Sequence, residues 1–335
     1  MKKIITLLLV FLMLFALCAC EGSEVNYNQN SESVSSEVNN EESNQSYSSP
    51  IEGELSKVTP LFWKATGKNG EIIWLLGSIH VGTPEYYPLP KAITEAFNSS
   101  DYLAVECDIV AFESDIQAAL DVVNLLAYSD GTTIKDHIPL ELYGRAVKVL
   151  NDAGQYSLLY DYYKPAFWEG LISNICVEEA GLDTKLGIDM HFLKDAKAKG
   201  KKIVEIESAM EQYSMLTGFS EELEIELLTS AVESRENKSD VDGICELIVA
   251  WGEGDEEAIG AMILPEDGVE FSEIENEYWD AMYSNRNKKM ADFCVEALKS
   301  GEEAFVVVGL AHFFGEDGII NLLIEEGYTV EKITY

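Results

Sequence analysis

The chain has 335 residues, with 60 Asp and Glu against 23 Lys and Arg, which gives a formal net charge of −37 at pH 7. A negative field of this size disfavours nucleic acid and anionic lipid headgroups as partners, so no nucleic-acid function is expected. None of the six cysteines follows another at a Cys-x-x-Cys spacing, which excludes a zinc-ribbon signature.

The first 19 residues have the pattern of a signal peptide. Lys2 and Lys3 precede an apolar segment from Ile4 to Leu17, which is too short to span a bilayer as a helix. The sequence around Cys20 is similar to the bacterial lipoprotein signal, in which cleavage before a cysteine leaves that residue lipidated. This resemblance implies that Cys20 carries a lipid anchor on the extracytoplasmic face of the cell membrane. Ordinary secretion with cleavage nearby is the alternative.

Residues 20–57 are dominated by Ser, Asn and Glu and contain few large apolar side chains. Such a segment cannot bury enough apolar surface to offset the entropy lost on ordering, so it is predicted to be a disordered tether. Residues 58–335 have the composition of one globular unit, because no second linker or charge block divides them. We therefore expect a single folded domain at the end of a lipid-anchored tether.

Two apolar runs end in the same Gly-x-x-His pattern. One occupies residues 72–80 and ends at His80, and the other occupies residues 303–312 and ends at His312. Apolar runs of this length that stop at a glycine are typical of strands buried on both faces. Both imidazoles are then expected at the carboxyl edge of an α/β sheet, where such folds bind ligands. The alternative is that two structural histidines with satisfied hydrogen bonds end these strands.

The other elements predict the fold class. An Asn-Gly pair between residues 61–66 and 71–76 indicates a β-hairpin. Further strands are expected at 101–108, 201–208, 303–309 and 328–334. Helical patterns occupy 111–198, 209–300 and 317–326. This order predicts an α/β fold with a central mixed β-sheet flanked by helices and a large helical insertion between the strands.

Three carboxylates end predicted strands near the two histidines: Glu106, Asp108 and Glu207. Two imidazoles with a carboxylate are a usual ligand set for a divalent metal such as Mn²⁺ or Co²⁺, which favours hydrolysis as the chemistry. In so acidic a chain, the alternative for each carboxylate is a solvated strand end. His137 and His191 lack the strand context, so they are expected to be surface or packing residues.

Six segments of the folded part form a recognisable set: Leu76-Gly77-Ser78-Ile79-His80, Val105-Glu106-Cys107-Asp108, Leu186-Gly187-Ile188-Asp189, Gly200 to Glu207, Arg286-Asn287 and Val308-Gly309-Leu310-Ala311-His312. Together they resemble the TraB/PrgY/GumN family, which includes the Tiki metalloproteases. The resemblance implies a metal-dependent, peptidase-like site in which His80, Glu106 and His312 bind the metal.

The same resemblance places Glu207 and Arg286 at recurrent polar positions of the family. We expect Glu207 to transfer protons and Arg286 to stabilise an oxyanion or bind a substrate carboxylate. Asp189 is interpreted as the N-cap of the helix that follows it. Cys107 departs from the family pattern and would add a soft ligand if its strand bulges.

These observations predict a lipid-anchored, extracytoplasmic, metal-dependent hydrolase that acts on a peptide or protein substrate. The alternative is a non-catalytic binding lipoprotein that captures a peptide signal or an iron or haem compound in the same crevice. Metal-dependent turnover distinguishes the two hypotheses.

Overall fold

The structure is a computed structural model that describes residues 57–266 and 268–335. The predicted signal peptide, Cys20 and nearly all of the predicted tether lie outside the described residues. Within the described part, none of the helices combines the length and the apolarity that crossing a bilayer requires.

Six strands form one mixed sheet. They are β1 (Phe62–Thr66), β2 (Ile72–Ser78), β3 (Tyr102–Val105), β4 (Lys202–Glu205), β5 (Ala304–Gly309) and β6 (Thr329–Lys332). Their order across the sheet is β4-β3-β5-β2-β1-β6. Strands β4, β3, β5 and β2 are parallel, whereas β1 pairs antiparallel with both β2 and β6. The predicted hairpin and the predicted mixed sheet are therefore confirmed.

Helices account for most of the remaining chain. The helices before β4 are α2 (Lys91–Ser99), α3 (Ile109–Phe112), α4 (Ile116–Leu126), α5 (Ile134–His137), α6 (Leu140–Asp152), α7 (Pro165–Glu179) and α8 (Ile188–Lys199). The later ones are α9 (Ala209–Leu216), α10 (Glu221–Asn237), α11 (Ser239–Glu253), α12 (Glu256–Ile263), α13 (Glu273–Trp279), α14 (Asn285–Ser300) and α15 (Ile319–Glu325). A π-helical turn, η6 (Asp280–Ser284), joins α13 to α14.

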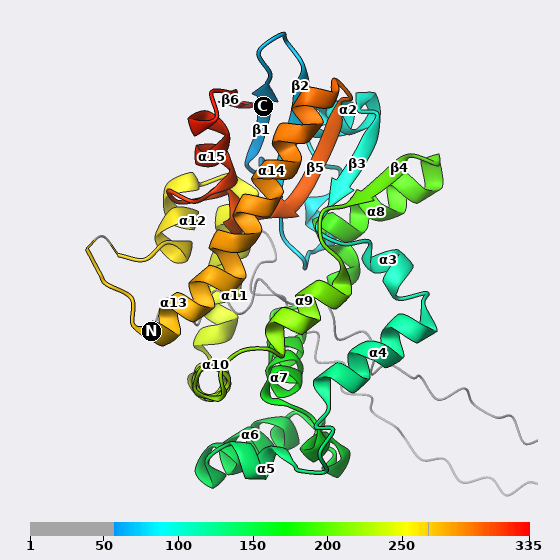
Figure 1. Ribbon diagram of the computed structural model, residues 1–335. Coiled ribbons are helices and arrows are strands. Elements are labelled where there is room, and N and C mark those ends of the chain that lie inside the picture. The colour runs from blue at the N-terminus through cyan, green and yellow to red at the C-terminus, as the bar shows by residue number, and fades with distance from the viewer. Residues whose placement is uncertain (1–56, 267) are drawn as a thin grey trace, which may run out of the picture.

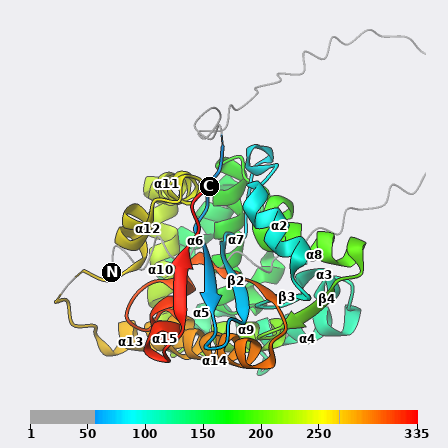
Figure 2. The same cartoon turned by 90° about the horizontal axis from the view of Figure 1, so that it is seen from above.

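The sheet lies between two helical layers, with α14 and α15 on one face and α2 and α8 on the other (Figure 2). The ring of Phe305 on β5 packs against Phe97 of α2 and Phe192 of α8, at ring-centroid distances of 5.5 and 4.9 Å. Strand β5 is buried along its whole length, which is why its sequence is a continuous apolar run without alternation.

The large helical insertion is also confirmed. Helices α4 to α7, α9 and α10 lie below the sheet in Figure 1, beyond the end at which β5 finishes. Within the helical pattern predicted over residues 209–300, the π-helical turn η6 interrupts the α-helical geometry, a feature that often marks functional sites. Strand β4 is four residues long, half of the predicted segment, and its ends are exposed at the edge of the sheet.

Candidate functional site

The first histidine is held by a carboxylate from helix α8. His80 follows β2 by two residues, and its Nδ1 lies 2.7 Å from Asp189 Oδ2. The other carboxylate oxygen of Asp189 accepts a hydrogen bond of 2.8 Å from the hydroxyl of Ser78. Because a carboxylate can only accept, the Nδ1 of His80 carries the proton and the lone pair of the neutral ring lies on Nε2.

Gly187 explains how Asp189 reaches this position. The backbone N–H of Ile188 donates to the carbonyl of Ile79 at 3.0 Å, so the start of α8 lies directly against the end of β2. A Cβ on Gly187 would lie 2.6 Å from the carbonyl carbon of His80, closer than side chains approach backbone. Glycine at the N-cap of α8 therefore permits the contact. Asp189, interpreted from the sequence as that N-cap, lies inside the first turn of the helix and holds His80.

The second histidine is held by an amide from helix α14. His312 lies in a short 3-10 turn after β5, and its Nδ1 is 2.6 Å from Oδ1 of Asn287. The amide oxygen can only accept, so His312 is likewise protonated on Nδ1 and leaves its Nε2 lone pair for another partner. That Nε2 lies 3.8 Å from Oε1 of Glu106.

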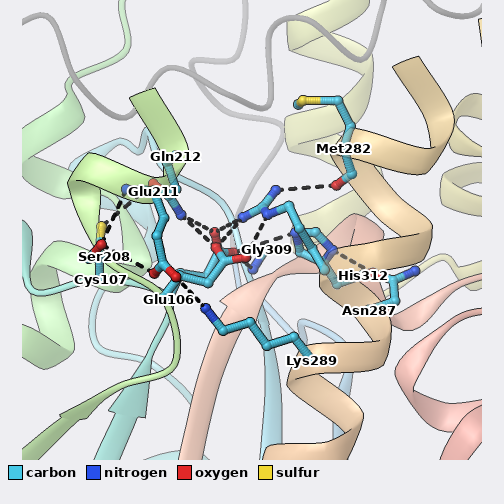
Figure 3. Close-up of polar contacts among 12 residues, drawn as sticks. Glu106, Cys107, Ser208, Glu211, Gln212, Met282, Asn287, Lys289, Gly309 and His312 are labelled. Carbon is cyan, nitrogen blue, oxygen red and sulfur yellow. Dashed lines mark hydrogen bonds and ion pairs between the residues drawn. The ribbon is translucent and has the colours of Figure 1, made fainter. Parts of the chain in front are cut away.

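Glu106 lies at the centre of a buried charge network. Arg286 donates to Oε2 of Glu106 at 2.6 Å and to both oxygens of Glu207, at 2.9 and 2.8 Å. The side-chain amide of Gln212 donates to the same two carboxylates, at 3.0 and 2.9 Å. Figure 3 shows Glu106 with Gln212 on one side and His312 and Asn287 on the other. Charge-assisted bonds of this kind fix the geometry of both carboxylates.

Gly309 is the point at which the strand ends converge. It is hydrogen-bonded through its N–H to Oε1 of Glu106 at 2.6 Å. A Cβ built on Gly309 would lie 3.1 Å from that oxygen, 3.7 Å from Nε2 of His80 and 3.5 Å from Cδ2 of His312. The parallel register places Ser78 of β2 opposite Gly309 of β5, so the two Gly-x-x-His motifs are offset by one residue. Both histidines and Glu106 therefore lie within 4 Å of one point, and a side chain at position 309 would occupy it.

The pKa values of the two histidines are shifted in opposite directions, although their sequence motifs match. For His80, burial lowers the pKa, but the adjacent carboxylate of Asp189 outweighs that effect and the pKa is raised overall. For His312, burial lowers the pKa well below its ordinary value, and the positive charge of Arg286 adds to the effect. His312 is therefore the neutral imidazole of the pair across the whole physiological range.

The site is almost closed in this structure. His80 is 8% exposed, Arg286 6% and His312 3%, while Glu106 is 1% exposed. The guanidinium of Arg286 contacts two carboxylates and the carbonyl of Met282, and it does not face an open cavity. In this conformation Arg286 holds Glu106 and Glu207 in position.

A divalent metal fits the donor chemistry of this cluster. Two imidazole nitrogens with available lone pairs and one carboxylate oxygen converge, and each histidine has the second hydrogen-bond partner that metal-binding histidines usually have. No group of three His, Cys, Asp or Glu side chains in residues 57–266 and 268–335 already has metal-site spacing. Both oxygens of Glu106 accept hydrogen bonds in this conformation, Oε2 from Arg286 and Oε1 from the N–H of Gly309.

Two candidate ligands lie apart from the convergence point. Asp108 caps helix α3 through the N–H of Ala111 and pairs with Lys197 at 2.8 Å. The thiol of Cys107 donates to Gln212 at 3.6 Å, and burial, with the nearby charge of Glu106, raises its pKa. Cys107 therefore remains a thiol beside the network and does not supply a thiolate to it.

The other two histidines behave as the sequence predicts. His137 stacks on Tyr128 at a centroid distance of 4.2 Å and bonds to the hydroxyl of Thr132. His191 packs between Tyr87 and Phe192. Both are packing residues, remote in sequence and in contacts from the paired motifs.

Sequence reasoning missed Gln212 and Asn287 as members of the site. Asn287 was visible only as the neighbour of Arg286, and nothing in the local pattern of residues 209–216 distinguishes Gln212 from a solvated helix residue. Both are 2% exposed or less, so their roles follow from burial at the sheet edge.

Comparisons with known proteins agree with this architecture. The profile of the TraB/PrgY/gumN family matches residues 61–332. Uncharacterized protein YbaP of Escherichia coli K12 and its counterpart of the same name in Shigella flexneri are each 26% identical over 143 residues. These alignments cover 42% of this chain and 50% of each relative, so the chain spans about half the length of the curated relatives it matches. No solved structure matches the chain. The family profile covers well over half of the sequence, and the chain belongs to the TraB/PrgY/gumN family.

Proposed function

We propose that the protein is a lipid-anchored, extracytoplasmic, metal-dependent hydrolase of peptide bonds. The observation that carries the proposal is the pairing of each histidine with an acceptor on Nδ1, which leaves two Nε2 lone pairs beside the carboxylate of Glu106. A fixed tautomer on both rings is what a metal ligand requires.

In this proposal His80, His312 and Glu106 hold a divalent ion such as Mn²⁺ or Co²⁺, which when bound supplies the Lewis acidity that hydrolysis needs. Asp189 and Asn287 orient the two rings. Arg286 and Gln212 hold Glu106 and Glu207 side by side, so that Glu207 is placed to accept and return a proton. The burial of the site excludes bulk water from these groups.

The proposal is tested by metal analysis of the purified protein, followed by unbiased peptide cleavage profiling with and without a chelator. His80→Ala and His312→Ala are each expected to remove bound metal and cleavage. His137→Ala is the matched control, because His137 is a packing histidine outside the site. Normal metal content and normal cleavage in both site variants would overturn the proposal.

The burial of the site also favours a second candidate, a binding protein without turnover. A cluster whose side chains are all 8% exposed or less admits a metal ion or a small ligand more readily than a polypeptide. Stoichiometric metal binding without cleavage of any peptide in the profiling experiment would support this second function.

The lipid anchor is a separate part of the proposal. Cys20→Ser is expected to abolish lipid modification and to move the protein from the membrane fraction to the soluble fraction after a salt wash. The folded domain should be unaffected, because the substitution lies outside it. A variant that stays in the membrane fraction would show that something other than a lipid on Cys20 holds the protein there.

A further inference from the structure

Gln212 bridges the two carboxylates at the sheet edge, and its amide has one defined orientation. Its Nε2 lies 3.0 Å from Oε2 of Glu106 and 2.9 Å from Oε2 of Glu207. A carboxylate can only accept hydrogen bonds, so the NH2 end of the amide must face both of them. The oxygen end needs a donor of its own, because Gln212 is only 2% exposed and buried amide oxygens are nearly always paired.

The thiol of Cys107 supplies that donor. Its Sγ lies 3.6 Å from Oε1 of Gln212, and the amide oxygen can only accept, so the S–H group donates. Cys107 is itself 2% exposed, so bulk water does not compete for the amide oxygen. Both side chains lie beside Glu106 in Figure 3.

The main chain brings the two side chains together. The N–H of Glu207 donates to the carbonyl of Glu106 at 2.8 Å, which continues the pairing of β3 with β4 past the ends of the strands. Helix α9 begins directly afterwards, with Ser208 as its N-cap, and Gln212 is one turn into it. Side chains on a helix tilt towards its N-terminus, so Gln212 reaches back over the strand ends, where Cys107 follows Glu106.

The orientation of the amide depends on this thiol. Without it the buried oxygen of Gln212 would lose a hydrogen-bond donor, which costs free energy. Turning the amide over would not relieve the loss, because it would place the amide oxygen against the carboxylate oxygens of Glu106 and Glu207. A donor at position 107 is therefore coupled to the amide orientation that bridges the two carboxylates.

We propose that Cys107 is a positioning residue of the sheet-edge site. Its thiol fixes the amide of Gln212, and the amide in turn holds Glu106 and Glu207. The thiol acts through a hydrogen bond, in place of the additional soft ligand that the sequence suggested at this position. The inference concerns the network itself, whereas its consequence for metal binding rests on the proposed function.

The first experiment is a double-mutant cycle of unfolding in denaturant, made with Cys107→Ala, Gln212→Ala and the double variant in the full chain. Loss of the thiol should shift the unfolding equilibrium about three- to tenfold more in the wild type than in Gln212→Ala, because only the wild type has the hydrogen bond. Cys294→Ala removes another buried thiol, and as the control it should shift the equilibrium equally in both backgrounds. Equal shifts for Cys107→Ala would mean that the thiol only packs, and would overturn the proposal.

The second experiment observes the hydrogen bond in the folded protein by infrared spectroscopy of the S–H stretch. The difference spectrum between the wild type and Cys107→Ala isolates the band of Cys107. The same difference in the Gln212→Ala background isolates the band without its acceptor. Hydrogen bonding lowers the S–H frequency, so the band should lie lower in the wild type, and a band at the same frequency in both backgrounds would overturn the proposal.

The third experiment, a titration of metal-free protein with Mn²⁺, separates this inference from the proposed function. If the site binds the ion, Cys107→Ala should weaken binding about three- to tenfold in the wild type and have no further effect in Gln212→Ala. Weakening of equal size in both backgrounds would count against the role of Cys107. A protein that binds no metal would fail the proposed function, while the unfolding cycle and the infrared band would still decide the role of the thiol.

Discussion

Two pairs of carboxyl groups in this molecule have opposite surroundings. Glu106 and Glu207, at the sheet edge, share one guanidinium and one side-chain amide, and their oxygens form hydrogen bonds at 2.6 to 3.0 Å. Burial raises the pKa of Glu169 on α7 to about 8 and that of the half-buried Glu224 on α10 to about 7, and the positive charge of Lys164 partly offsets the rise for Glu224.

The difference separates carboxylates that are paired with a cation from a carboxyl group that burial keeps protonated. At the sheet edge the protein supplies its own counter-charge, so the carboxylates are held in place before any ligand arrives. In the helical half burial keeps Glu169 protonated near neutral pH, so this carboxyl group carries no charge that needs a cation. Carboxylates held in place in this way are preorganised for chemistry.

The largest expected effect comes from removing the cation of the sheet-edge pair. Arg286→Met should destabilise the protein by about 3 to 5 kcal/mol, because it leaves Glu106 and Glu207 buried together without a counter-charge. Denaturant unfolding at pH 7 measures the change. If the variant unfolds at the same midpoint as the wild type, the network does not hold the carboxylates in the way described here.

The next largest effect is the pH dependence of stability that arises from Glu169. Below pH 4.5 the Glu169 carboxyl group is protonated in both the folded and the unfolded protein. Between about pH 4.5 and 8 it is protonated in the folded protein but ionised in the unfolded chain. The contribution of Glu169 to the free energy of unfolding is therefore most favourable at low pH. This contribution is lost as the pH rises towards 8. The loss should be on the order of 2 to 4 kcal/mol.

Glu169→Gln removes this titration and should flatten the difference in unfolding free energy between pH 5 and pH 8 relative to the wild type. Glu222→Gln is exposed and should leave the wild-type slope in place. The measurement is a series of denaturant titrations across that pH range. A slope that Glu169→Gln leaves intact would show that Glu169 has a partner in solution.

A smaller effect is expected from the amide that joins the sheet-edge carboxylates. Gln212→Ala should cost about 1 to 3 kcal/mol, since it deletes hydrogen bonds to two buried charged groups while Arg286 remains. Thermal unfolding at neutral pH gives the value. An unchanged melting temperature would mean that water replaces the amide, and hence that the cluster is more open than its burial indicates.

The smallest effect is expected from changing the hydrogen-bond partner of His312. Asn287→Asp would give His312 a carboxylate partner like that of His80, so the pKa of His312 should rise from its present value well below 6.5. The stability change should be about 1 kcal/mol, with the extra negative charge offset in part by Arg286. NMR titration of the imidazole in metal-free protein measures the pKa, with the His80 signal as internal reference.

The candidate site was predictable where it depends on strand ends. His80 and His312 could be placed at one edge of the sheet because each follows a buried parallel strand through a glycine, and β2 and β5 are adjacent and parallel. Glu106 follows β3 in the same way, next to β5. The residues that complete the network, Gln212 and Asn287, lie on helices whose local spacing does not reveal what they face.

The sequence by itself determined the strand segments, the hairpin, the mixed sheet with a large helical insertion between its strands, and the three residues that converge on Gly309. These depend on local properties: apolar runs, turn chemistry and the fixed direction in which parallel strands end. Only the tertiary structure decided that Asp189 holds His80 instead of capping α8, that Arg286 neutralises two carboxylates, and that burial raises the pKa of Glu169. The physical reason is that each of these outcomes depends on how distant helices pack against the sheet, and on how far that packing removes a charged group from water, which no single segment encodes.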